Sequence, residues 1–378
     1  MKCADVVVLG AGIVGAACAA ELARQGLTVE IIDASGIGCG TSGAGMGHLV
    51  VMDDSPAEFA LSQWSVALWR ELESEFGPQQ GYRQCGTLWV AADDAEMQVA
   101  QARLEKLRAG GVICDLLDEQ QLRACEPSLR PGLPGALRVP GDGVVYPPAV
   151  AAWLLAAQRP WASCLRTRFG QAVVALKKNG VQLADGTLVH AGAIVLANGM
   201  GAMEFVPGLP LAPKKGHLVI TDRYPEMIRH QVLELGYLKS AHQSSGASVA
   251  FNVQARPTGQ LLIGSSRQFG EHDPALDPEI LGRMLRRAAE FLPALPALHA
   301  IRAWTGFRAA SSDGLPLIGP AHTQADAPWL AVGHEGLGVT TSLATAKLIA
   351  AQLLDLESAI PIAPYLPARF LNLQSAYG

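Results

Sequence analysis

The first 33 residues contain two short apolar runs separated by a segment of small residues. VVVLG at 6–10 and VEIID at 29–33 are typical of buried parallel strands, and Ala16 to Leu22 between them is typical of a helix packed against a sheet. This order predicts a strand, a helix and a second parallel strand. The chain is therefore expected to begin with the first unit of an α/β fold.

Helical spacing of apolar residues recurs later in the first half of the chain. It is clearest at 55–76, where the spaced residues are Phe59, Leu61, Trp64, Leu68, Trp69 and Leu72. The other helices predicted in this half lie at 95–109, 118–125 and 147–157, and a strand is predicted at 86–92. A glycine-rich loop at 35–47 is flexible enough to pass close to a flat ligand.

Alternation of apolar and polar residues predominates in the second half. Short strands joined by turns at Asn179-Gly180 and Asp185-Gly186 predict an antiparallel meander that ends near Gly199. Several alternating segments between His217 and Ser265 predict a second, mainly antiparallel sheet. A helix at 277–292 then separates this sheet from the C-terminal stretch.

The length of 378 residues favours two domains, because it exceeds one typical hydrophobic core. We expect a discontinuous dinucleotide-binding domain with the second sheet inserted into it. The expected bounds are 1–85, 145–215 and 300–378 for the dinucleotide-binding domain, and 86–144 and 216–299 for the inserted substrate domain.

Gly10, Gly12 and Gly15 stand between the first strand and its helix, and Asp33 ends the second strand. In this context the glycines permit a tight turn, close approach of backbone N–H groups to a pyrophosphate, and helix packing. The Asp33 carboxylate suits ribose hydroxyls and would repel a 2′-phosphate, which favours FAD or NAD over NADP.

Composition excludes several classes of partner. The net charge is −5, from 29 basic and 34 acidic residues without a basic block, so nucleic acid is not expected. No apolar run is long enough to span a bilayer, and the glycine spacing of the apolar opening argues against a signal peptide. Seven cysteines without zinc-type spacing predict reduced thiols, a cytoplasmic protein and no metal site.

Two C-terminal segments sharpen the prediction. The first is AWTGFRAASSDGLPLIGP at 303–320, and the second is WLAVGHEGLGVTTSLATAKLIAAQLL at 329–354. The second predicts a strand, a glycine-rich turn and a helix that begins near Thr340. The positive end of such a helix would stabilise the negative charge that develops on a flavin ring during reduction.

These segments, with GAGIVG, IIDASGIGCGTSGAG, GTLWVAAD and PKKGH, resemble the FAD-dependent D-amino-acid oxidase superfamily in its glycine oxidase and D-amino-acid dehydrogenase branch. The resemblance spans nearly the whole chain. It departs from the family at LANGMGA and at Ala309, where proline commonly follows the arginine. CGTLWVAAD, MGHLVVMDDSPAEFAL and APKKGHLVITD look most like the β subunit of D-hydroxyproline dehydrogenases.

The resemblance implies a Rossmann-like FAD-binding domain of the glutathione-reductase type with an inserted, mainly antiparallel substrate domain. It also implies non-covalent FAD, because related enzymes tether flavin to a cysteine in the C-terminal part and none follows Cys164 here. The residues expected to bind FAD are Gly10, Gly12, Ile13, Val14, Gly15, Asp33, Ala34, Thr41, Ser42, Gly45, Met46, Gly47, Val173, Gly199, Gly306, Arg308, Gly336, Leu337, Gly338, Val339 and Thr340.

Three residues are expected at the reacting centre. Arg308 matches the family position whose guanidinium holds the substrate carboxylate, although a structural salt bridge is the alternative. His48 lies either against the flavin ring or in a packing role, and Tyr237 lies either at the carboxylate or in the core.

Further side chains leave alternatives open. Tyr224, like Tyr237, lies either at the substrate carboxylate or in the core. His334 and Glu335 either line the pocket or face water, and Lys214 and Lys215 either contact flavin or are solvated.

The implied activity is oxidation of the C–N bond of a small D-amino or imino acid, with hydride transfer to flavin. The expected substrate is cis-4-hydroxy-D-proline. The alternatives are a stand-alone glycine- or sarcosine-type amine oxidase, an opine dehydrogenase subunit, an NAD-linked oxidoreductase and an electron-relay subunit. The expected partners are the small-molecule substrate and the other subunits of a hetero-oligomeric dehydrogenase. Any peripheral membrane association would occur through these subunits.

Overall fold

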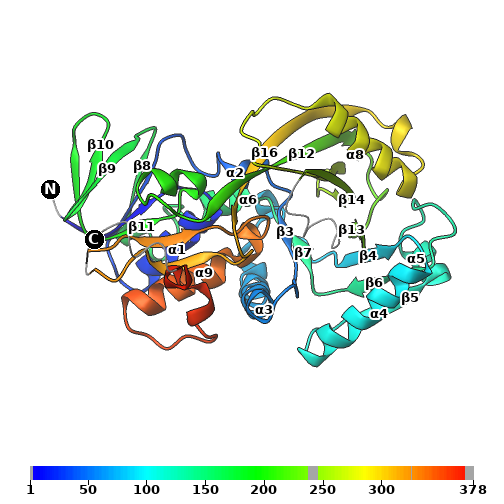
Figure 1. Ribbon diagram of the computed structural model, residues 1–378, viewed down its shortest axis with the longest axis horizontal. Helices are drawn as coiled ribbons and strands as arrows, with labels where there is room; N and C mark the ends of the chain where they lie inside the picture. The colour runs from blue at the N-terminus through cyan, green and yellow to red at the C-terminus, as the bar shows by residue number, and fades with distance from the viewer. Residues whose placement is uncertain (1–2, 237–245, 325, 371–378) are drawn as a thin grey trace. The chain divides into compact units, whose positions relative to one another are not determined.

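The computed structural model describes residues 3–236, 246–324 and 326–370, and it divides into two compact units (Figure 1). Unit 1 comprises Met1–Gln80, Tyr146–Pro213 and Arg308–Gly378, and unit 2 comprises Gly81–Val145 and Lys214–Phe307. Each unit combines chain segments that are far apart in the sequence.

Unit 1 is built on a mixed sheet whose strands are β1 (Ala4–Leu9), β2 (Val29–Asp33), β8 (Leu165–Phe169), β9 (Val173–Lys177), β10 (Gly180–Leu183), β11 (Leu188–Leu196), β17 (Leu317–Pro320) and β18 (Trp329–Val332). The main order is β17-β18-β11-β1-β2-β8, with β10 and β9 added beside β11. The pairs β18–β11, β11–β1, β1–β2 and β2–β8 are parallel. This confirms the Rossmann-like fold class.

The helices of unit 1 are α1 (Ile13–Arg24), α2 (Thr41–Ala44), α3 (Pro56–Glu71), α6 (Pro147–Leu154) and α9 (Gly338–Leu353), and a short strand β3 (His48–Leu49) follows the glycine loop. α1 packs along α9, and α9 also packs on α3 (Figure 1). Small buried residues such as Ala16, Ala20 and Ala346 allow α1 and α9 to approach closely. Both helices therefore begin in one region of the unit.

Unit 2 is built on a sheet of order β16-β12-β15-β14-β13-β4-β6-β5. Its strands are β4 (Thr87–Ala91), β5 (Asp115–Asp118), β6 (Gly135–Val139), β12 (Leu211–Arg223), β13 (Gln231–Glu234), β14 (Ala247–Ala255), β15 (Gln260–Phe269) and β16 (Ala300–Ser311), with a short β7 (Gly143–Val144) nearby in sequence. Of the pairs with assigned register only β13–β4 is parallel, so the sheet is mainly antiparallel as expected.

Within the described part of unit 2, the sheet is covered by α4 (Asp94–Ala109), α5 (Glu119–Cys125) and α8 (Pro278–Phe291). Phe251 of β14 and Phe291 of α8 stack with ring centroids 4.8 Å apart in the core of this unit. The expected domain bounds lie close to the unit bounds, and binding of substrate by unit 2 stays a prediction. None of the helices among the described residues is long and apolar enough to cross a membrane.

Candidate functional site

The turn between β1 and α1 has no room for side chains at two of its glycines. Gly10 has a φ of +99°, and a Cβ there would lie 2.7 Å from the carbonyl oxygen of Ala197. A Cβ at Gly15 would lie 1.9 Å from the carbonyl oxygen of Gly10. The backbone turns tightly here, next to Ala197, which directly follows β11 and comes just before Gly199. Glycine is therefore required at these two positions.

The N-terminus of α1 presents N–H groups with few protein acceptors. Its N-cap, Gly12, supplies no side chain, and its first turn contains no acidic residue. The N–H of Ile13 donates to the Ser42 hydroxyl at 2.9 Å, which leaves the hydroxyl hydrogen of Ser42 for another acceptor. A helix start of this kind, with its positive dipole end, fits a pyrophosphate.

Asp33 lies beside this turn and is already hydrogen-bonded to backbone. One carboxylate oxygen accepts from the N–H of Ala11 at 2.7 Å, and the other accepts from Ser35 and Gly36 at 2.8 and 3.0 Å. Because a carboxylate has about four acceptor positions, the first oxygen can still accept from a ribose hydroxyl. The N–H of Gln171 donates to the Asp33 carbonyl at 3.2 Å, which brings the segment before Val173 to the same place.

A second helix N-terminus, that of α9, lies next to the first. A Cβ at Gly338 would lie 3.8 Å from the side chain of Val14 in α1. The N-cap of α9 is Leu337, no side chain caps it, and the first turn again lacks acidic residues. The N–H groups of Gly338, Val339 and Thr340 belong to this first turn, where a helix has no internal acceptors for them. The arrangement fits an electron-rich ring or an anion.

Thr340 connects this helix to β3. Its hydroxyl donates to the carbonyl of His48 at 2.9 Å and accepts from the N–H of Val50 at 3.3 Å. The indole N–H of Trp69 donates to the Thr340 carbonyl at 3.0 Å. The Thr340 side chain therefore has a structural role, and only its backbone N–H remains for a cofactor. The same bonds hold the half-buried His48 beside the start of α9.

Arg308 lies next to the turn that precedes α9. A Cβ at Gly336 would lie 3.7 Å from Nε of Arg308. The end of β16 is held there by an N–H bond from Glu335 to the Ala309 carbonyl at 2.9 Å and by an isolated antiparallel bridge between Ala310 and His334. The structure thus brings the predicted carboxylate-binding arginine to a segment predicted to bind the cofactor.

The side chain of His334 faces the protein interior, so the expectation that it faces water is wrong. It is 9% exposed, and its Nε2 lies 3.0 Å from the Thr345 hydroxyl. Burial lowers its pKa from 6.5 to about 4, so the imidazole is neutral at pH 7. Its neighbour Glu335 has a φ of +49°, a left-handed conformation that is uncommon outside glycine and occurs at functional sites.

Residues predicted in unit 2 have mixed outcomes. Lys214 and Lys215 are 4% and 3% exposed in β12, so the alternative that they are solvated is wrong. The Lys214 ammonium lies 4.3 Å from the ring centroid of Phe269. The Tyr224 hydroxyl accepts from the N–H of His299 at 2.9 Å, which gives it a structural partner. Tyr237 lies outside the described residues.

Glu58 is a residue at this site that the sequence reasoning missed. Ser55 caps α3 by accepting from the N–H of Glu58, and the Glu58 carboxyl accepts from the N–H of Asp54 at 3.1 Å. Burial, together with the negative charges of Asp54, Glu335 and Asp53, raises the pKa of Glu58 to about 7. The signal for this residue was present as serine followed three positions later by glutamate before an apolar run.

The geometry of unit 1 fits FAD: two uncapped helix starts lie together, glycines form a tight turn before α1, and a carboxylate lies at the end of β2. The remaining residues expected at the cofactor extend from these segments. Ala34 follows β2, Thr41 begins α2, Gly45, Met46 and Gly47 precede β3, and Gly306 lies in β16 within unit 2.

Comparisons with known proteins agree with this fit. A model of the family described as FAD dependent oxidoreductase matches residues 5–352. Hydrogen cyanide synthase subunit HcnC of Pseudomonas aeruginosa is 28% identical, over 97% of this chain and 96% of that protein. Glycine oxidase of Pseudomonas aeruginosa is 29% identical, over 96% of this chain and 98% of that protein.

A solved structure supports the same assignment. The crystal structure of glycine oxidase from Geobacillus kaustophilus matches with a TM-score of 0.86 at 26% identity, covering 98% of this chain and 99% of that chain. Since the family model also spans most of the sequence, the chain belongs to the FAD-dependent oxidoreductases of the D-amino-acid oxidase superfamily, and its cofactor is FAD.

Proposed function

We propose that this protein oxidises the C–N bond of a small D-amino or imino acid. The observation that carries the proposal is the position of Arg308 beside Gly336, at the turn before α9. The planar guanidinium can bind the substrate carboxylate through two parallel hydrogen bonds and so orient the α-carbon. FAD supplies the hydride acceptor. The similarity to glycine oxidase supports the same class of chemistry.

The protein's own contribution is positioning and charge stabilisation. A substrate whose amine binds neutral needs no protein base, so the rate depends on how Arg308 holds the carboxylate. The N–H groups at the start of α9 stabilise negative charge on the reduced cofactor. The His48 carbonyl accepts a hydrogen bond from the Thr340 hydroxyl at the start of α9, and contact of the His48 ring with the flavin is part of the proposal.

Within this class, we favour cis-4-hydroxy-D-proline as substrate and a partner subunit or a quinone-type molecule as electron acceptor. The support is the similarity of MGHLVVMDD and CGTLWVAAD to the β subunit of D-hydroxyproline dehydrogenases. The seven cysteines are not spaced to hold an iron–sulfur centre, so such a relay would reside in another chain. The similarity to HcnC, a subunit by name, also favours an assembly.

The test is anaerobic reduction of the bound flavin, followed by absorbance, across a panel of substrates. The panel contains cis-4-hydroxy-D-proline, D-proline, other D-amino acids, glycine, sarcosine and opines. We expect the fastest bleaching with cis-4-hydroxy-D-proline and slow oxygen consumption by the isolated chain. Rapid peroxide production from glycine or sarcosine without a response to hydroxyproline would instead identify a stand-alone amine oxidase, the alternative that the glycine oxidase relative supports.

A further inference from the structure

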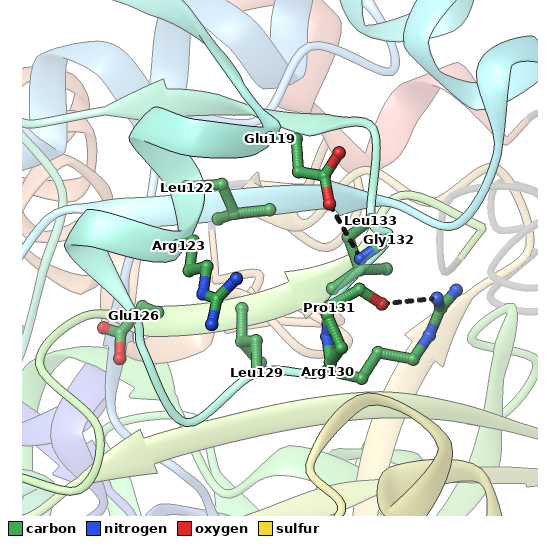
Figure 2. A pocket seen from close by; sticks show the side chains of 9 residues that line it. All are labelled: Glu119, Leu122, Arg123, Glu126, Leu129, Arg130, Pro131, Gly132 and Leu133. Atoms are coloured by element: carbon green, nitrogen blue, oxygen red, sulfur yellow. Dashed lines mark hydrogen bonds between the residues drawn. The ribbon is translucent and has the colours of Figure 1, made fainter.

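Two pockets among the described residues differ greatly in size. Figure 2 shows the first, in unit 2, where the N–H of Gly132 donates to Glu119 at 2.9 Å. Its volume of about 10 Å³ holds roughly one water molecule, so no organic ligand fits. The second lies within unit 1 and has a volume of about 250 Å³. This second cavity, which we call the four-helix cavity, is large enough for a small organic molecule.

The four-helix cavity is bounded by α1, α3, α6 and α9 and by the segments that follow α3 and α6. Much of its wall is apolar and is formed by Ala17, Ala20, Leu68, Leu72, Trp153, Leu154, Trp161, Leu343 and Ala346. Trp153 and Trp161 are each only 9% exposed. The wall therefore suits an apolar body.

One side of the cavity carries excess positive charge. Lys347 of α9 donates to the Glu21 carboxylate at 2.9 Å, and Arg24 approaches the same carboxylate at 3.7 Å. Glu21 is 6% exposed, whereas the side chains of Lys347 and Arg24 are 34% and 48% exposed. Two cations thus share one carboxylate on the side formed by α1 and α9, which leaves capacity to bind a second anionic group.

Acidic side chains also line the cavity at and after the end of α3, while Arg159 and Arg24 both lie over the Trp161 ring, 4.6 and 5.3 Å from its centroid. Arg159 forms an ion pair with Glu75, and its guanidinium lies 3.9 Å from the ring centroid of Trp153. Glu71, at the end of α3, also lines the cavity and is exposed. Because Glu75 is paired with Arg159, Glu71 supplies the negative charge at the end of α3 that can attract an ammonium group.

We infer that the four-helix cavity binds a zwitterionic amino acid with an apolar side chain, its carboxylate at Lys347 and Arg24 and its ammonium at Glu71. A phosphate-bearing ligand is disfavoured because the lining contains three glutamates and only two cations. A metal ion is disfavoured because the described residues contain no group of three His, Cys, Asp or Glu side chains that could hold one.

The four-helix cavity is distinct from the candidate cofactor site. Glu21 lies eight residues after Ile13, and Lys347 lies nine residues after Gly338. At 1.5 Å per residue, these positions are ~12–14 Å along α1 and α9 from the two helix starts. The inference rests on the residues of this cavity and does not depend on the proposed reaction.

The test is isothermal titration of the FAD-bound protein with L-leucine under anaerobic conditions. We expect saturable binding with a Kd of about 1 mM or lower. Leucinamide lacks the carboxylate and 4-methylpentanoate lacks the ammonium, so each should bind at least tenfold more weakly. Binding of 4-methylpentanoate as tightly as L-leucine, or no saturable binding of L-leucine, would overturn the inference.

Variants locate the binding. Glu71→Gln and the cavity-filling Leu68→Phe should each weaken L-leucine binding at least tenfold, with flavin content unchanged. The double variant Glu21→Gln/Lys347→Gln should also weaken L-leucine binding at least tenfold. It removes both members of an ion pair, so neither is left without its partner. Glu73→Gln is the matched control, because Glu73 is exposed nearby but does not line the cavity. Unchanged binding in Glu71→Gln and Leu68→Phe, or equal loss in Glu73→Gln, would overturn the assignment.

Discussion

Asp33 illustrates how one side chain serves both the protein and its cofactor. Its carboxylate holds the N–H groups of Ala11, Ser35 and Gly36 and has a free acceptor position for ribose. We expect Asp33→Ala to weaken FAD binding by roughly 10- to 100-fold, because one charge-assisted hydrogen bond contributes about 1.5–3 kcal/mol. Equilibrium dialysis of FAD measures the change.

The matched control for this variant is Asp185→Ala, which removes a carboxylate that accepts from the N–H of Thr187 in the turn between β10 and β11. FAD affinity should be unchanged in the control, and the order of preferred substrates should be unchanged in both variants. If Asp33→Ala retained full flavin occupancy after dilution, the ribose assignment would be wrong.

Arg308 is the second residue at which a single substitution is informative. Arg308→Lys keeps the positive charge and loses the planar pair of donors, so we expect kcat/KM for the substrate to fall at least tenfold while FAD remains bound. Stopped-flow flavin reduction gives the rate. Arg302→Lys, on the same strand but exposed and beside Trp304, is the matched control. Loss of flavin from Arg308→Lys, or activity equal to that of the wild-type protein, would show that the carboxylate assignment is wrong.

Local backbone requirements were predictable at the residue scale, whereas long-range partners were not. The space around Gly10 and Gly15 follows from a tight turn that the local sequence already specifies. The bond between Thr340 and His48 joins residues 292 positions apart, and local sequence carries no signal for such a contact. The sequence left open whether Lys214 and Lys215 are buried, because their charge alone does not reveal the partners that a buried lysine has.

At the scale of elements, the start of α3 beside the turn before α9 creates a pH-dependent contribution to stability. The pKa of Glu58 is raised from 4.5 to about 7 by burial and neighbouring carboxylates. The folded protein therefore binds more protons than the unfolded chain in this window, and stability falls as pH rises from 4.5 to 7. The free energy of unfolding of the wild-type protein should fall by up to ~3 kcal/mol over this pH range, and Glu58→Gln should remove this fall.

The measurement for Glu58 is the thermal midpoint at fixed FAD concentration across this pH range. Glu58→Gln should gain stability relative to the wild-type protein as pH rises, with little difference below pH 4.5. Glu73→Gln is the control, because it removes an exposed carboxylate just after the C-terminal end of α3, whereas Glu58 lies in the first turn of that helix. Parallel curves for Glu58→Gln and the wild-type protein would contradict the assignment.

His334 contributes to the pH dependence of stability with the opposite sign to Glu58. Burial lowers its pKa from 6.5 to about 4, so the unfolded chain binds more protons between these values. Stability from this residue is present above pH 6.5 and is lost as pH falls towards 4. We expect His334→Gln, which can retain a bond to Thr345, to flatten the acid side of the stability profile. Denaturant midpoints at acidic and neutral pH test this, and an unchanged acid slope would exclude His334 as its source.

Most elements were predicted because their apolar periodicity reflects the surface that each one buries. One exception is the helix predicted at 147–157, which ends as α6 at Leu154. The indole N–H of Trp161 donates to the Leu154 carbonyl at 3.0 Å and satisfies one of the carbonyls that a continued helix would have bonded. This contact arises after the chain turns back, and local periodicity does not encode it.

At the scale of the whole molecule, the order of strands depended on contacts that only the fold defines. The sequence predicted an interrupted first domain, yet it did not specify that β18 pairs with β11 or that β13 pairs in parallel with β4. Such pairings join segments more than 100 residues apart. β1 leads into α1 near the start of the family match at residues 5–352, and β18 leads into α9 near its end. The candidate cofactor site therefore combines segments from both ends of this match.

This arrangement gives a prediction for the whole molecule: FAD is held without a covalent bond. All seven cysteines are free, and none lies in the C-terminal segments that form the turn before α9. The cysteine of the glycine loop, Cys39, is exposed, and its thiol lies 3.7 Å from the Ile37 carbonyl. We therefore expect acid precipitation to leave the yellow colour in the supernatant, for the wild-type protein and for Cys39→Ser alike. Colour in the pellet of both proteins would show a covalent bond at a residue other than Cys39, for which His48→Ala is the next variant, and colour lost from the pellet only in Cys39→Ser would identify Cys39 as the attachment site.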